Sequence, residues 1–299
     1  MAHATFATTS RGLDRSLAPM KLFEKAKRIG VWNPSDFDFT KDREDWERLT
    51  ESEQTLLIHL TSVFQAGEEA VTLDLLPLIG AVGRDGRVEE EIYLTSFLWE
   101  EAKHVDFFQR FLTEVAGVTG DISHFHGPNY RYLFYEVLPT TMNALTTDSS
   151  PAALAKASAT YNMIIEGVLA ETGYHAYFTV CDRLQILPAQ RDGVSHIKQD
   201  EARHIAYGVY LLSRLMAEHP GLWDVVEGAM NELIGPALGI VEETLGSYDP
   251  VPFELKVSDF TEFAVGQFQK RFDRIQRARG MTMAEIDELT HAVIESGDA

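Results

Sequence analysis

The feature that most constrains this chain is a Glu-x-x-His motif that occurs twice, each time inside an apolar run with helical periodicity. Each copy is preceded, one helix earlier, by a further glutamate on an apolar helix face. Four carboxylates and two imidazoles directed into one core are too costly to bury unless cations neutralise them. Two divalent metal ions would balance the four carboxylate charges. The six residues of this set are Glu68, Glu101, His104, Glu166, Glu201 and His204.

Helical periodicity distinguishes the inward-facing glutamates from their acidic neighbours. Glu68 lies on the apolar stripe of its helix, whereas Glu69 falls beside polar residues. Glu101 is likewise surrounded by apolar positions, and Glu100 lies off that stripe. The i, i+3 spacing of each motif places its glutamate and its histidine about one turn apart on one face, so both can reach a single ion.

A single Glu-x-x-His in a helix is usually a solvated pair, so the argument rests on the repetition. Glu68 precedes Glu101 by 33 residues, and Glu166 precedes Glu201 by 35. A duplicated helical hairpin with a crossover connection explains these nearly equal spacings. Mixed carboxylate and imidazole ligands suit Fe and Mn and argue against thiophilic metals.

The same pattern predicts an all-α fold with a ferritin-like four-helix bundle core and additional flanking helices. No linker or low-complexity segment divides the chain, so we expect a single domain over residues 1–299. The expected elements are an irregular N-terminal segment at 1–45, a helix from a Thr50 cap to about Pro77, helices at about 87–116, 151–182, 188–219, 221–247 and 258–279, and a short tail at 280–299.

Composition excludes several classes of partner. The net charge of -20 comes from 46 acidic and 26 basic residues, which argues against binding to nucleic acid or anionic membranes. No apolar run reaches the length of a membrane span, and residues 1–15 lack the apolar region of a secretory signal. The one cysteine, Cys181, cannot form an internal disulfide, so we expect a cytoplasmic protein.

Further residues then point to a known family. The six candidate ligands, the Trp32-x-Pro34 sequence and Asp200 match in order and spacing the small subunit of ribonucleotide reductase, which the chain resembles over most of residues 30–245. Within that family the chain resembles the ribonucleotide reductase small-subunit-like ligand-binding oxidases in Glu68-x-x-Val71 and in Tyr161.

This resemblance has several implications. It implies one Mn and one Fe per chain, with di-iron as the alternative, and a long-chain fatty-acid-like ligand at the metals. It also implies a covalent ether link between Val71 and Tyr161, and a homodimer. Tyr161 lies five residues before Glu166, about 140° away around a regular helix, so its approach to the site needs a bulge or a neighbouring helix. Without the resemblance, the sequence indicates that Tyr161 is a buried tyrosine that forms a hydrogen bond elsewhere.

Two observations bear on the choice between a reductase subunit and an oxidase. Many reductase subunits carry a radical tyrosine four residues after the first ligand histidine, and here that position is Phe108. Those subunits also need a tyrosine in the C-terminal tail, whereas the last tyrosine here is Tyr248. Trp32 and Asp200 are then remnants of the long radical route, or a short electron path to the centre.

We therefore expect a dinuclear metal oxidase that uses O2 for the two-electron oxidation of a C–H bond, with an unknown reductant and a hydrophobic ligand. The alternative is a ribonucleotide reductase small subunit of the type that works without a tyrosine radical. Iron storage, which would need a hollow multimeric cage, and a purely structural helical bundle are the remaining classes.

Overall fold

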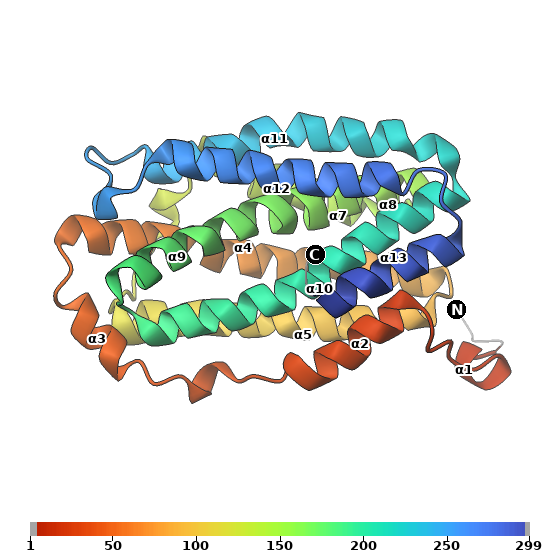
Figure 1. The fold of residues 1–299 in the computed structure, drawn as a ribbon, viewed down its shortest axis with the longest axis horizontal. Coiled ribbons are helices and arrows are strands. Elements are labelled where there is room, and N and C mark those ends of the chain that lie inside the picture. The colour runs from red at the N-terminus through yellow and green to blue at the C-terminus, as the bar shows by residue number, and fades with distance from the viewer. Residues whose placement is uncertain (1–4, 297–299) are drawn as a thin grey trace.

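The computed structural model describes residues 5–296, and within that range the chain is built of helices and connecting segments without a strand. Most of the helices run along the long axis of the molecule (Figure 1). The elements are α1 Ala7–Ser10, α2 Ala18–Ile29, η1 Pro34–Asp36, α3 Thr40–Trp46, α4 Glu51–Arg84, α5 Val88–Arg110, η2 Phe111–Val115, η3 Ser123–Phe125, α6 Pro128–Arg131, η4 Tyr132–Val137, α7 Leu138–Ala144, α8 Pro151–Ser158, η5 Ala159–Ala170, α9 Glu171–Leu184, α10 Pro188–Glu218, η6 Pro220–Leu222, α11 Trp223–Leu245, η7 Pro252–Glu254, α12 Val257–Arg277 and α13 Met283–Ser296.

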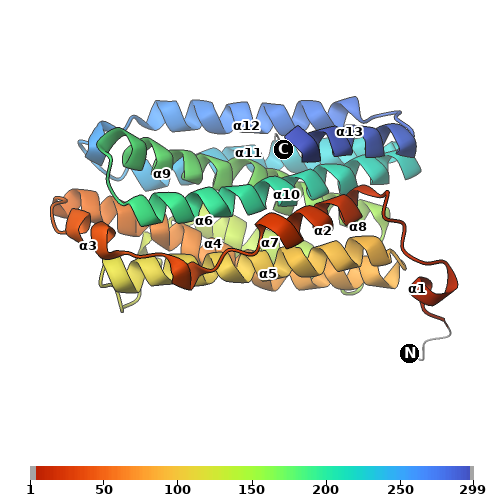
Figure 2. The same ribbon diagram turned by 60° about the horizontal axis from the view of Figure 1, so that its bottom comes forward.

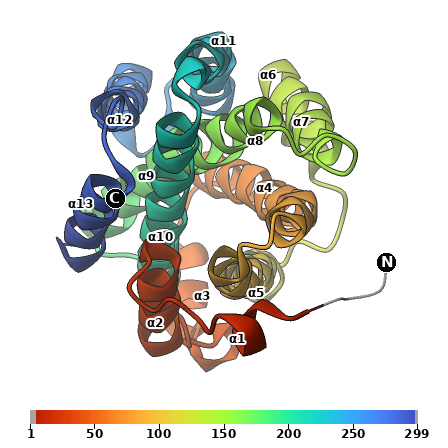
Figure 3. The ribbon, with the colours of Figure 1, turned by 90° about the vertical axis from the view of Figure 1, so that its right-hand side faces the viewer.

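Four long helical runs form the core of the bundle. They are α4, α5, the continuous run α8–η5–α9, and α10, and Figure 3 shows them end-on. α4 packs along α5 as one hairpin, and α10 packs against η5 and α9 as the other. The crossover between the hairpins carries α6, η4 and α7, of which α7 packs on α4. The all-α, ferritin-like prediction is therefore confirmed.

The remaining helices cover the outside of the core. α11 and α12 pack against η5, while α2 packs against α5 and α10 (Figure 2). α13 lies against α10 and α2. Among residues 5–296, no helix is both long enough and apolar enough to cross a membrane.

Local sequence signals set several of the helix ends. Thr50 caps α4 by accepting a hydrogen bond from the backbone N–H of Glu53, whose side chain accepts one from the Thr50 N–H in return. Ser150 caps α8 ahead of a proline at the first helical position. Gly117 ends the predicted 87–116 helix in the left-handed region at φ +67°, which a side chain would disfavour.

Two predictions of element boundaries were wrong. α4 does not end or break at Pro77 but continues to Arg84. Proline removes one hydrogen bond, to the carbonyl four residues earlier, and that carbonyl belongs to Leu73, whose side chain is 64% exposed. The loss therefore falls on the solvent side of α4, where water can replace the bond.

The described part of the predicted irregular segment, residues 5–45, is also not irregular, because it contains α2 and the start of α3. α2 is amphipathic and buries Leu22 and Ala26 against the bundle, which stabilises a helix that lacks a side-chain cap. Most of the predicted short tail, 280–299, is the helix α13 within the described residues.

Candidate metal centre

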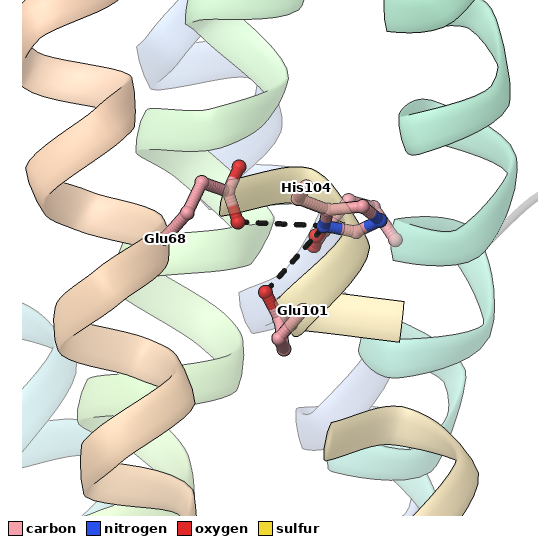
Figure 4. A group of neighbouring side chains, drawn as sticks. Glu68, Glu101 and His104 are labelled. Carbon is pink, nitrogen blue, oxygen red and sulfur yellow. Dashed lines mark ion pairs between the residues drawn. The ribbon is translucent and has the colours of Figure 1, made fainter. Parts of the chain in front are cut away.

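The six predicted ligands come together in the middle of the four-helix core. α4 contributes one glutamate, η5 contributes one, and α5 and α10 each contribute a glutamate and a histidine. None of the six residues is more than 5% exposed. Figure 4 shows Glu68 reaching from α4 towards Glu101 and His104 on α5. The six residues are Glu68, Glu101, His104, Glu166, Glu201 and His204.

The cluster divides into two overlapping groups, each with four ligand atoms that lie within 4.8 Å of one another. Glu101 and Glu201 belong to both groups. The first group adds Glu68 and His104, whose Oε2 and Nδ1 atoms lie 3.4 Å apart. The second group consists of Glu101, Glu166, Glu201 and His204. In it, His204 Nδ1 lies 3.0 Å from Glu101 Oε1 and 3.7 Å from Glu166 Oε1. Two ions with two bridging carboxylates would fit this arrangement.

Unpaired ligand atoms inside the cluster test whether metal ions fit. Buried polar atoms in proteins almost always have hydrogen-bond partners, yet several atoms here have none. Those atoms belong to five of the six residues and are Glu101 Oε1 and Oε2, His104 Nδ1, Glu166 Oε1, Glu201 Oε2 and His204 Nδ1. Carboxylate oxygens and imidazole nitrogens are the donors that Mn and Fe bind, so the residues fit a dinuclear centre.

The protonation of the cluster leads to the same conclusion. Burial raises the pKa of Glu68 and of Glu166 well above the usual range. Although burial opposes it, the surrounding carboxylates also raise the pKa of His104 and His204 well above normal. Without metal ions, these glutamates and histidines therefore bind protons, which reduce the negative charge of the cluster. Bound metal ions would supply that positive charge and replace the protons.

The outer nitrogen of each histidine is bound by a buried carboxylate. His104 Nε2 lies 3.3 Å from Asp200 Oδ2, and His204 Nε2 lies 2.9 Å from Glu100 Oε2. Such a partner fixes the ring orientation and leaves Nδ1 free to face a metal. Trp32 donates from Nε1 to Asp200 at 2.8 Å and stacks on His104, so both predicted electron-path residues contact the centre.

Tyr161 approaches the centre because its helix changes from α to π, a change that the sequence did not predict. Residues 159–170 form the π-helical segment η5, in which residues five apart are joined by backbone hydrogen bonds and lie nearly in line. Tyr161 and Glu166 have this separation. The Tyr161 hydroxyl donates to the Val71 carbonyl at 3.3 Å, so the two predicted cross-link residues are in contact.

A cavity adjoins the carboxylate side of the centre. All four glutamates line it, and neither histidine does. Its other walls are almost entirely apolar and come from α4, α6, η4, η5, α9, α11 and α12. They include Phe64, Val71, Ile165, Leu169, Tyr174 and Phe260. The cavity therefore offers an apolar molecule an approach to the carboxylate side of the centre.

The periodicity argument missed four residues that support the ligands. Glu100, assigned to a position off the apolar stripe, is completely buried because it pairs with Arg203 at 2.5 Å and with His204. Lys103 donates to Asp200 at 3.1 Å, and Asn162 donates to Glu166 at 2.9 Å. Charge complementarity in the sequence could have indicated the first pair. Glu100 directly precedes the ligand glutamate on α5, and Arg203 directly precedes the ligand histidine on α10.

Comparisons with known proteins agree with this geometry. The sequence profile of the family "Ribonucleotide reductase, small chain" matches residues 21–264. A solved R2-like ligand-binding oxidase with aerobically reconstituted Mn/Fe cofactor is 36% identical, with a TM-score of 0.89, over 92% of this chain and 98% of that one. A glycine-to-leucine variant of an R2-like ligand-binding oxidase with aerobically reconstituted Fe/Fe cofactor is also 36% identical, with a TM-score of 0.89, over 92% and 99%.

Both cofactors named among the predictions, Mn/Fe and di-iron, therefore occur in similar proteins. The family and the dinuclear enzyme class expected from the sequence are confirmed. The chain belongs to the ribonucleotide reductase small-chain family, in its branch of R2-like ligand-binding oxidases, which are oxidoreductases with a dinuclear metal cofactor.

Proposed function

We propose that this chain is a Mn/Fe oxidase that activates O2 for the two-electron oxidation of a C–H bond. The observation that carries the proposal is the set of buried, unpartnered ligand atoms beside an apolar cavity. A structural bundle gains nothing from such a set, because each unpaired buried polar atom is destabilising. Di-iron is the alternative composition.

In this proposal the six residues divide the work of ligation. Glu68 and His104 would hold one ion and Glu166 and His204 the other, and Glu101 and Glu201, which belong to both ligand groups, would be available to both ions. Although burial alone would raise it, the influence of the two neighbouring histidines holds the pKa of Glu101 at about 2. Glu101 therefore keeps its negative charge and would attract either cation.

The apolar side of the centre supports a long-chain fatty-acid-like ligand. The cavity offers the four ligand carboxylates at one end and hydrocarbon side chains along its walls. The ligand carboxylate would be directed to the metal ions and its chain would lie along the apolar walls, which would also exclude water from the centre.

We further propose an ether cross-link between Val71 and Tyr161. A reduced Mn/Fe centre, when bound, supplies two of the four electrons that convert O2 to water. The other two come from the chain, as the Tyr161 O–H bond and a Val71 C–H bond break and a C–O bond forms. Burial raises the pKa of Tyr161 well above normal, so the hydroxyl keeps its proton until that step.

The proposal also includes an external reductant, a homodimer and a cytoplasmic location. Trp32 and Asp200 provide a contact from the outer layer of the protein to His104, which suits electron delivery from an external reductant that remains to be identified. A homodimer is proposed from family similarity. The buried free thiol of Cys181 suits a reducing cytoplasm.

Intact mass spectrometry after aerobic loading with Mn and Fe tests this reading. We expect the mass of the chain to fall by two hydrogens, about 2 Da, and Tyr161→Phe to abolish the loss because no O–H bond remains to break. Tyr177→Phe is the matched control, since Tyr177 is equally buried but bonds to Thr61 instead of Val71. An unchanged mass in the wild type would rule out the cross-link.

The family match also raises the possibility of a reductase small subunit. In that class a radical tyrosine often occupies the position of Phe108, which here is fully buried and stacks on Phe64 and Tyr177. Mixing the metal-loaded chain with a reductase large subunit separates the two functions. We expect no nucleotide reduction, and measurable turnover would favour the alternative.

A further inference from the structure

A single buried arginine connects the supports of both ligand histidines. Arg203 is 2% exposed, and its Nη2 atom donates to Glu100 Oε1 and to Asp200 Oδ1, each at 2.5 Å. Its Nη1 atom donates to the backbone carbonyl of Gln199 at 2.9 Å, which fixes the guanidinium against its own helix.

The two carboxylates that Arg203 binds use their other oxygens for the histidines. Glu100 Oε2 contacts His204 Nε2, and Asp200 Oδ2 contacts His104 Nε2. The contacts therefore run without interruption from His104 through Asp200, Arg203 and Glu100 to His204. Lys103, by comparison, bonds to Asp200 and not to Glu100, so its contact is confined to the His104 end.

The charges of this outer layer balance among themselves. The carboxylates of Glu100 and Asp200 are matched by the cations of Arg203 and Lys103. The four glutamates of the centre are then left to match two divalent ions. Without Arg203 the layer would carry an uncompensated buried negative charge directly behind the histidines, and both carboxylates would lose their shared anchor.

The end of α2 closes over this layer at a glycine. A side-chain carbon at Gly30 would lie 2.1 Å from Glu100 Oε1, 2.8 Å from the backbone oxygen of Ala26 and 2.9 Å from Arg203 Nη2, so only glycine fits without moving the pair or the end of α2. The Gly30 carbonyl also accepts a hydrogen bond from Lys103 at 2.6 Å. The backbone thus leaves room for this ion pair and for no larger residue.

We propose that Arg203 is a positioning residue that sets the orientation of both ligand histidines and thereby couples the affinities of the two metal sites. The planar guanidinium suits this role, because one nitrogen can donate to two carboxylates on different helices. The inference rests on the proposed function, in which these six residues hold two ions.

The test is a set of full-length variants loaded anaerobically with Mn²⁺ alone. Site-specific affinities come from chelator competition combined with the occupancy of each site in crystals. Arg203→Met should weaken both sites, each by about 10- to 100-fold, because both histidines lose orientation. Glu100→Gln should weaken mainly the His204 site, and Lys103→Met mainly the His104 site, by about tenfold. Arg203→Lys should recover part of the affinity at both sites.

Melting of the metal-free proteins separates positioning from simple stability. A merely structural arginine would lower the melting temperature and leave the affinities of the remaining folded protein unchanged. If Arg203→Met does not fold, Gly30→Ala displaces the same ion pair while retaining every charge, and we expect it to weaken both sites.

Different results would contradict the proposed function and the proposed role of Arg203. Wild-type protein that binds fewer than two ions would contradict the proposed function. Wild-type protein that binds two ions, with a folded Arg203→Met or Gly30→Ala variant that retains both affinities or loses only one, would overturn the role of Arg203.

Discussion

The two sides of the metal centre are chemically opposite. Behind the histidines lies a charged layer in which every carboxylate has a cation, formed by Glu100, Lys103, Asp200 and Arg203. In front of the glutamates lies an apolar cavity whose walls carry few polar groups. We refer to these regions as the charged layer and the cavity. The four residues of the charged layer are buried, whereas several residues of the cavity wall, such as Val63 and Leu169, are only partly buried.

This contrast shows how one centre can be both rigid and open. Charged hydrogen bonds hold the imidazoles from behind, where nothing needs to enter. The carboxylates face a space lined by side chains such as Phe64 and Val71, which offer no competing ligand. Changes in the charged layer should therefore alter metal binding, and changes in the cavity should alter what the centre acts on.

The largest effect should come from removing a residue that both sites share. Glu101→Ala deletes a carboxylate that belongs to both ligand groups, so we expect metal content to fall from two ions per chain to nearly none. Element analysis after loading measures this. Glu69→Ala is the control, because Glu69 is exposed on α4 beside Glu68 and should leave both ions in place. Retention of two ions by Glu101→Ala would contradict the ligand assignment.

A change in the charged layer should have the next largest effect. Asp200→Asn removes the anion behind His104 and leaves Lys103 and Arg203 with one carboxylate fewer. We expect about 10- to 100-fold weaker binding at the His104 site and a loss of stability of about 3–5 kcal/mol. Ligand retention in the cavity should not change. Weaker ligand binding with intact metal affinity would reverse the assignment of the two sides.

A change in the cavity should spare the metals and affect the ligand. Ala176→Leu adds bulk to the cavity wall, and we expect an overpacking cost of about 1–3 kcal/mol to fall on the bound ligand. Affinity for a long-chain fatty acid should then drop roughly tenfold, as measured by mass spectrometry of extracted lipid. Ala102→Leu, on the exposed face of α5, is the control. Equal lipid content in both variants would argue against the cavity as the binding site.

The smallest effect on metal content should come from Trp32. Trp32→Phe removes one hydrogen bond to Asp200, which keeps its contacts with Lys103, Arg203 and His104. We expect two ions to remain, with affinity reduced by roughly a factor of 3 or less, about 0.6 kcal/mol. Reduction of the loaded centre by an external donor should slow. A normal reduction rate, followed by stopped-flow absorbance, would remove Trp32 from the electron path.

The sequence was sufficient to predict which six side chains cluster in the core, because each is buried for a periodic reason. The glutamates and histidines fall on apolar helix faces, and helical spacing is rigid enough to project those faces into one core. The same rule failed for Glu100, which is buried by a specific ion pair with Arg203 and not by its position on a stripe.

Features that depend on tertiary context were outside the reach of periodicity. The π-helical segment that turns Tyr161 towards Val71 is a change of helical pitch, and no pattern of residue types in 159–170 distinguishes it from an α-helix. The continuation of α4 past Pro77 and the existence of α2 likewise depend on packing against neighbours.

The most direct test of the account is a crystal structure after anaerobic loading with Mn and Fe in competition, with anomalous diffraction measured at both metal edges. The account predicts two ions, one held by Glu68 and His104 and the other by Glu166 and His204, with Glu101 and Glu201 between them and one metal of each kind per chain. A single ion, or two ions bound outside these six residues, would contradict it.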